Sequence, residues 1–104
     1  MKYEYTPAFI ADLKRLKPEH LKQFRAVVAT KFALACDEYA ANPAAYNWPA
    51  SLRVSYLRGT RGIMEMTWHF ASPDGRATFE FVTIDGELHC RWRRVGDHGG
   101  YTHP

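Results

Sequence analysis

The sequence predicts an α+β fold in which a two-helix hairpin packs on one face of an antiparallel sheet. Three observations support this fold class. Apolar residues recur at helical spacing in the first part of the chain, they alternate with polar residues in the second part, and short segments rich in glycine and proline separate these patterns. The 104 residues, 46% of them hydrophobic, are enough for one core, so we expect a single domain over residues 1–104.

The first part of the chain predicts a short strand followed by two helices. Tyrosines alternate with charged residues over positions 2–5, which is typical of a strand. Thr6 and Pro7 then supply a helix N-cap and a proline at the first helical position. Pro18 ends this helix and opens the next one, and apolar residues at helical spacing predict the second helix over residues 19–41. A tight joint between two such helices makes a helical hairpin.

Period-two alternation predicts four further strands, joined by short turns as an antiparallel meander. One side of these strands is apolar and should face the helices: Leu52, Val54, Tyr56, Met64, Met66, Trp68, Phe70, Ala77, Phe79, Phe81, Leu88, Cys90 and Trp92. The other side collects polar and charged residues: Arg53, Ser55, Glu65, Thr67, His69, Arg76, Thr78, Glu80, His89, Arg91 and Arg93. This polar face is either a functional site or an ordinary solvated face with cross-strand ion pairs.

Charge and cysteine content narrow the class of protein. The formal net charge of +3 permits a nucleic-acid partner without requiring one. All seven basic residues of segment 48–104 are arginines, which bind phosphate in a bidentate manner. Cys36 and Cys90 fit neither a disulfide framework nor a zinc motif, so we interpret both as core residues in a reducing compartment. The chain has no bilayer-spanning apolar run and no secretory leader, and we therefore expect a cytoplasmic protein without a membrane partner.

Three segments in this order resemble the RelE/ParE superfamily, the toxins of bacterial type II toxin–antitoxin pairs. They are Leu-Arg-Val-Ser-Tyr-Leu-Arg-Gly at residues 52–59, Gly-Ile-Met-Glu-Met at 62–66, and Arg-Trp-Arg-Arg-Val-Gly-Asp-His at 91–98. The resemblance covers nearly the whole chain. It implies a small α+β fold, a cytoplasmic location, and a hetero-oligomeric complex with a cognate antitoxin protein. It also implies one of two activities, since RelE-like members cut mRNA in the 70S ribosomal A site and ParE-like members poison DNA gyrase.

Metal-free RNA cleavage requires a base for the ribose 2′-OH, cations around the phosphorane, and an acid for the leaving oxygen. Arg91 and Arg93 are two residues apart on the last strand and can supply the cations, His98 is the candidate acid or base, and Glu65 is the candidate carboxylate base. The residues expected to contact RNA are Arg53, Arg58, Arg76 and Tyr101. The histidines show no ligand spacing, so we expect no metal and no cofactor.

Each of these candidates also has a purely structural interpretation. Glu65 can pair with an arginine across strands, His98 can be a solvated loop residue, and Tyr101 can cover the core edge. The chain also departs from the RelE pattern, because it has no lysines over residues 53–58 and no terminal His-Tyr pair. The sequence leaves three classes open: a ribosome-dependent mRNA endonuclease, a gyrase inhibitor without chemistry of its own, and a DNA-binding or adaptor domain. The last is disfavoured by the low charge and the absence of a helix-turn-helix pattern.

Overall fold

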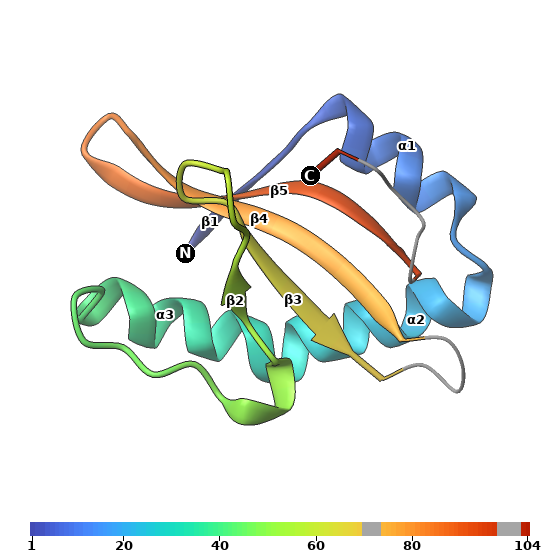
Figure 1. The fold of residues 1–104 in the computed structure, drawn as a ribbon, viewed down its shortest axis with the longest axis horizontal. Coiled ribbons are helices and arrows are strands. Elements are labelled where there is room, and N and C mark those ends of the chain that lie inside the picture. The colour runs from blue at the N-terminus through green and yellow to red at the C-terminus, as the bar shows by residue number, and fades with distance from the viewer. Residues whose placement is uncertain (70–73, 98–102) are drawn as a thin grey trace.

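The computed structural model describes residues 1–69, 74–97 and 103–104, and within them it has the α+β order expected from the sequence (Figure 1). The elements are β1 (Lys2–Tyr5), α1 (Pro7–Arg15), α2 (Pro18–Val27), the π-helical turn η1 (Val28–Phe32), α3 (Ala33–Ala41), the 3-10 turn η2 (Ala50–Leu52), β2 (Ser55–Tyr56), β3 (Met64–Trp68), β4 (Gly75–Ile84) and β5 (Glu87–Asp97).

The strands form one sheet in the order β1-β5-β4-β3-β2. Strands β2 to β5 are an antiparallel meander, as predicted. Strand β1 adds to the free edge of β5 in parallel, which makes the sheet mixed. A parallel neighbour requires a crossover connection, and here the helices provide it. Strand β5 therefore has β1 on one side and β4 on the other.

Helix α1 begins where the sequence predicts it, and its cap also ties it to the sheet. The Thr6 hydroxyl accepts a hydrogen bond from the backbone N–H of Phe9 at 3.1 Å, which is an N-cap bond. The same hydroxyl donates to the carbonyl oxygen of Arg93 at 2.8 Å, and the backbone N–H of Thr6 donates to that of Trp92. The first turn of α1 is thus attached to β5.

The second predicted helix is one continuous helical segment with a wider turn in its middle. Helix α2 passes through η1 into α3, and the Thr30 hydroxyl donates to the carbonyl oxygen of Ala26 at 2.7 Å inside this turn. Such side-chain bonds to the preceding turn compete with the regular helical ladder. Phe24, one turn before η1, and Phe32, the last residue of η1, are both buried. Among the residues described, no helix is sufficiently long and apolar to cross a membrane.

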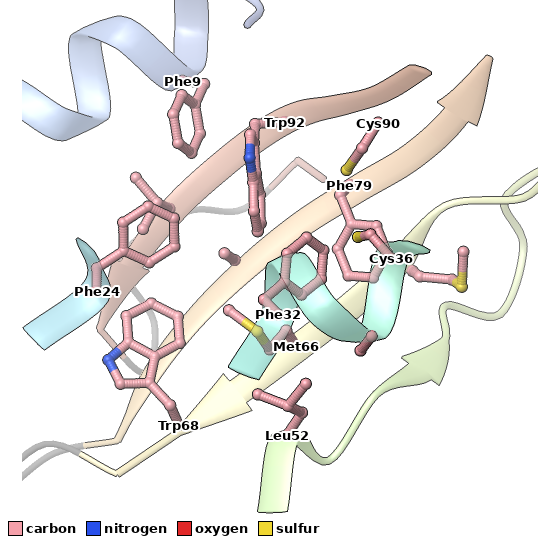
Figure 2. Packing of buried hydrophobic residues seen from close by; sticks show 14 residues of the cluster. Phe9, Phe24, Phe32, Cys36, Leu52, Met66, Trp68, Phe79, Cys90 and Trp92 are labelled. Atoms are coloured by element: carbon pink, nitrogen blue, oxygen red, sulfur yellow. The ribbon is translucent and has the colours of Figure 1, made fainter. Parts of the chain in front are cut away.

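Aromatic rings from the helices and the sheet form the centre of the core (Figure 2). Trp92 of β5 lies 4.6 Å from Phe32, 5.3 Å from Phe24 and 5.7 Å from Phe9, measured between ring centroids. Phe79 of β4 completes the contact with Phe32 at 4.9 Å. The alternation therefore correctly predicted the helix-facing side of β3, β4 and β5, whereas Phe70 lies outside the described residues.

The first predicted meander strand is mostly not a strand. Leu52 is buried as expected, but it closes the turn η2, and Arg53 follows in the left-handed region at φ 45°. Only Ser55–Tyr56 pairs with β3, and Tyr56 is 66% exposed instead of facing the helices. The strand is at the sheet edge and is two residues long. The period-two alternation over residues 52–56 therefore predicted a longer strand than the structure has.

Asp12 lies on the polar side of α1 by helical spacing, yet its carboxylate is buried against the edge of β5. It accepts hydrogen bonds from Arg94 Nε at 2.7 Å, from Arg94 Nη2 at 3.1 Å and from the backbone N–H of Val95 at 3.1 Å. β1 pairs with β5 only as far as Trp92, so α1 and Asp12 cover the rest of that edge. The side chain of Asp12 is 3% exposed.

Asp12→Asn should lower the free energy of unfolding by about 3 kcal/mol, because it leaves the guanidinium of Arg94 without its charged partner. Asp37→Asn is the control: Asp37 is 62% exposed and pairs with the N-terminal amine, so its loss should cost less than about 1 kcal/mol. Urea unfolding measures both values. Equal effects of the two substitutions would contradict the structural role given to Asp12.

Tyr3 of β1 packs against the part of the core that contains the two cysteines. Cys36 of α3 and Cys90 of β5 are free thiols in the core, as the sequence predicted. The Tyr3 hydroxyl is buried and has no hydrogen-bond partner in the described part of the chain. Burial raises the pKa of the Tyr3 phenol and of the Cys90 thiol well above their ordinary values.

The protein should lose stability in alkali, and Tyr3→Phe should reduce that loss. The folded state holds the Tyr3 proton more tightly than the unfolded state, so this contribution is complete below about pH 10, the ordinary phenol pKa, and falls as the pH rises above it. Urea unfolding from neutral pH to about pH 11 measures the dependence, with the exposed Tyr5→Phe as the control. If the free energy of unfolding fell equally steeply with pH in the wild type, Tyr3→Phe and Tyr5→Phe, the loss of stability in alkali would not come from Tyr3.

Candidate functional site

The sheet face opposite the aromatic core carries the charged residues, because successive side chains of a strand point to opposite faces. We call it the open face and define it by Glu4 of β1, Glu65 of β3, Arg76, Thr78 and Glu80 of β4, and His89, Arg91 and Arg93 of β5. Helices α2 and α3 lie on the other side of the sheet (Figure 1). The three central strands position most of this set.

Glu80 is the centre of the largest charged cluster on the open face. Its register partner on β5 is Arg91, which in turn is opposite Glu4 of β1. Arg93 Nη1 donates a hydrogen bond to Glu80 Oε2. Of the two arginines predicted from the sequence, Arg93 therefore binds a carboxylate directly, whereas Arg91 lies opposite the residue that carries it. That carboxylate is Glu80, which the sequence placed on this face but not in the catalytic set.

A β-bulge gives Arg93 and Arg94 their different surroundings. Thr78 is opposite Arg94 and Phe79 is opposite Trp92, which leaves Arg93 as the extra residue of β5. The sequence pattern predicts that Arg94 points to the other face or lies beyond the strand. The second alternative is wrong, because β5 extends to Asp97. The position after Arg94 belongs to Val95, which is buried in the core. Arg94 instead binds Asp12.

Glu65 has a different arginine partner. Its Oε1 atom lies 3.7 Å from Nη1 of Arg76, and the Glu65 side chain is 14% exposed. Strand β4 separates β3 from β5, so about 10 Å separates the Glu65 backbone from that of Arg91 and Arg93. Two buried atoms of β4, Arg76 Nε and Thr78 Oγ1, have no hydrogen-bond partner within the described ranges. Arg76 is therefore on the predicted face, in a subcluster with Glu65.

The other predicted RNA-contacting arginines lie outside the ladder. Arg53 is not on a strand, and its Nη2 donates to Asp74 Oδ2 at 3.0 Å, just before β4. His69 Nδ1 lies 2.9 Å from the other carboxylate oxygen. The hydrogen bonds from Arg53 and His69 lower the pKa of Asp74 below its ordinary value, and the bond from Arg53 has the larger effect. Arg58 is exposed in the turn between β2 and β3.

His98 and Tyr101 lie outside the described residues. The chain is described again at residues 103–104, which lie against β5: Arg93 Nε donates to the carbonyl oxygen of Pro104 at 2.9 Å, and Arg94 Nη1 to that of His103 at 3.1 Å. Thr6 and Ala8 join these four residues around a cavity of about 210 Å³. The two consecutive arginines therefore bind oxygen atoms on the same side of β5.

His89 is buried at the other end of the open face between two glutamates. Its Nδ1 lies 2.8 Å from Glu4 Oε2 and its Nε2 lies 3.8 Å from Glu87 Oε2. Lys2 binds the same Glu87 oxygen at 2.9 Å, and this bond lowers the pKa of Glu87. Within residues 1–69, 74–97 and 103–104, no three histidine, cysteine or acidic side chains could together hold a metal ion.

The open face is close to charge-balanced. Its three arginines are matched in number by three glutamates. This balance agrees with a solvated sheet face as well as with a site. The distinguishing feature is Glu80, a carboxylate with one arginine opposite it and a second hydrogen-bonded to it. Such a group can accept a proton while the guanidiniums bind an anion.

In comparisons with protein-family models, curated proteins and solved structures, no match to the chain was found.

Glu80→Gln should tighten binding of a short single-stranded RNA by about fivefold at low salt, because it removes a negative charge worth ~1 kcal/mol beside the two arginines. The advantage should shrink as salt is added. Fluorescence anisotropy across a salt series measures it, with Glu87→Gln at the exposed end of β5 as the matched control. Unchanged or weaker binding by Glu80→Gln would show that RNA does not bind at this cluster.

Proposed function

We propose that the chain is the toxin of a type II toxin–antitoxin pair and acts in the cytoplasm as a ribosome-dependent mRNA endonuclease. The observation that carries the proposal is the arrangement of Glu80, Arg91 and Arg93 on the open face. The resemblance of residues 52–59, 62–66 and 91–98 to RelE-like toxins supports it from the sequence.

The proposed reaction is attack of a ribose 2′-OH on the adjacent phosphodiester. The bond from O2′ to phosphorus forms, the bond from phosphorus to O5′ breaks, and the products are a cyclic phosphate and a 5′-hydroxyl. Glu80 takes the proton of the 2′-OH, while Arg91 and Arg93 stabilise the charge that develops on the phosphorane oxygens. His98 is the candidate acid for O5′ by sequence position, and Tyr101 the candidate for stacking on a base.

Glu65 is the second candidate base. Its carboxylate is paired with Arg76 as that of Glu80 is paired with Arg93. The same kind of ion pair therefore occurs between two neighbouring pairs of strands. We prefer Glu80 because it has a second arginine nearby: Arg93 is paired with it, and Arg91 lies opposite it. The phosphorane needs a cation besides the one that forms an ion pair with the base. Arg53 and Arg58 would contact RNA at the β2 end of the sheet, away from the cleaved bond.

The proposed partners are the cognate antitoxin, the mRNA and the 70S ribosomal A site, with no cofactor. A ribosome can supply much of the rate by holding the message in line for attack. The alternative is a ParE-like inhibitor of DNA gyrase. The near charge balance of the open face favours this second function, because a binding poison requires no excess of cations over carboxylates.

Primer extension on a translated message after induction tests the proposal. The wild-type chain should produce cuts inside codons, and Glu80→Gln and Arg91→Ala should reduce them by at least about 100-fold, the typical contribution of a general base. Arg61→Ala is the control because Arg61 is an exposed arginine of the β2–β3 turn. If Glu65→Gln abolished cutting and Glu80→Gln did not, the general base would be Glu65 instead of Glu80. Intact transcripts with DNA breaks would replace the nuclease proposal by the gyrase alternative.

A further inference from the structure

Residues 103–104, which we call the strap, lie against β5 and are held there by two consecutive arginines. Arg93 Nε donates a hydrogen bond to the carbonyl oxygen of Pro104 at 2.9 Å, and Arg94 Nη1 donates one to that of His103 at 3.1 Å. Figure 1 shows this segment beside β5 and near the beginning of α1. Both bonds end on main-chain oxygens, so they depend on the path of the backbone and not on the two side chains of the strap.

Arg94 anchors the strap and keeps its partner in α1. Its Nε and Nη2 atoms donate to the carboxylate of Asp12 at 2.7 and 3.1 Å, and Nη1 is the atom that donates to His103. The Asp12 side chain is 3% exposed and holds this guanidinium against β5, so the position of the Nη1 donor is set by the fold. The strap is therefore bound to the same arginine that joins α1 to the sheet.

The strap occupies a donor of Arg93 that a phosphate would need. A guanidinium binds a phosphate in the bidentate manner through two N–H groups on one edge, either Nε with Nη2 or Nη1 with Nη2. In the structure Nε donates to Pro104 and Nη1 donates to Glu80. Each edge of Arg93 therefore has one donor engaged, and a phosphate can bind in this manner only after one of the two acceptors has left.

Of these two acceptors, the strap is the easier one to displace. The Glu80 side chain is 17% exposed, so its release would leave a largely buried carboxylate without its counter-ion Arg93. His103 is exposed, and the strap borders a cavity of about 210 Å³ that Thr6 and Ala8 also line. Surface segments that bury little apolar area open at a low cost in free energy. The strap can therefore leave Arg93 while the sheet and the Glu80–Arg93 ion pair remain in place.

We propose that the strap is an autoinhibitory contact: residues 103–104 occupy the Nε–Nη2 edge of Arg93, and a phosphodiester must displace them to bind there. The phosphodiester would present two oxygens to that edge in place of the single main-chain oxygen. The identification of this phosphodiester with RNA rests on the proposed function. The contact itself rests on the geometry of Arg93, Arg94 and the strap.

Deletion of residues 103–104 should tighten binding of a short single-stranded RNA about tenfold, the change expected if the strap leaves Arg93 open in about a tenth of the molecules. Fluorescence anisotropy at low salt measures the affinity, and 2′-O-methyl groups throughout the RNA prevent its cleavage. The matched control is the double substitution His103→Ala and Pro104→Ala, because it changes both side chains and keeps both main-chain oxygens. This control should bind the RNA as the wild type does.

A second measurement follows the strap in the wild-type chain. NMR of the isotope-labelled protein reports the backbone amide of His103 and the side-chain Nε–H of Arg93, and both signals should move as the RNA is added. Equal RNA affinity of the deletion variant and the wild type, or an unmoved His103 signal at saturating RNA, would overturn the proposal. Neither measurement involves ribosomes or cleavage, so failure of the proposed nuclease activity would leave their outcome unaffected.

Discussion

The buried carboxylate of Asp12 joins α1 to β5, the strand that carries Arg91 and Arg93 and pairs with the strand of Glu80. Asp12 replaces the missing strand partner of Val95 and neutralises Arg94 in one contact. An unpaired N–H at a covered sheet edge would be costly, as would an uncompensated guanidinium. The contact lies directly after the β-bulge of β5, where the chain changes from Arg93 on the open face to Val95 in the core.

Strand β5 separates two surfaces of different character. Trp92 contacts Phe9, Phe24 and Phe32 on the helical side, at the centre of the core. Its neighbours Arg91 and Arg93 are on the open face, where Arg93 binds Glu80. One strand therefore carries core aromatic residues on its helical side and the arginines of the proposed RNA site on the open face.

Two arginines of the open face, Arg76 and Arg93, are paired with carboxylates, which limits the anions that this face can bind. The side chains of Arg76 and Arg93 are about one-third exposed, so both guanidiniums keep part of their hydration. A phosphate that binds there must compete with Glu65 and Glu80 for the same guanidiniums. An RNA substrate therefore needs a further source of binding free energy, and the proposed ribosomal A site would provide it by orienting the message.

The sequence by itself determined the fold class, the start of α1 at Pro7 and the two faces of β3, β4 and β5, because caps and periodicity are local properties that neighbouring residues decide. It also identified Arg91 and Arg93 as sharing a face. Only the tertiary structure decided that Arg93 binds Glu80, that Arg53 adopts a left-handed conformation before β2, and that Asp12 is buried. These depend on the β4–β5 register, the bulge at Arg93 and the packing of α1 on a sheet edge. Such features join residues far apart in the chain, and a local pattern carries no information about which distant partner will satisfy a charge or a free N–H.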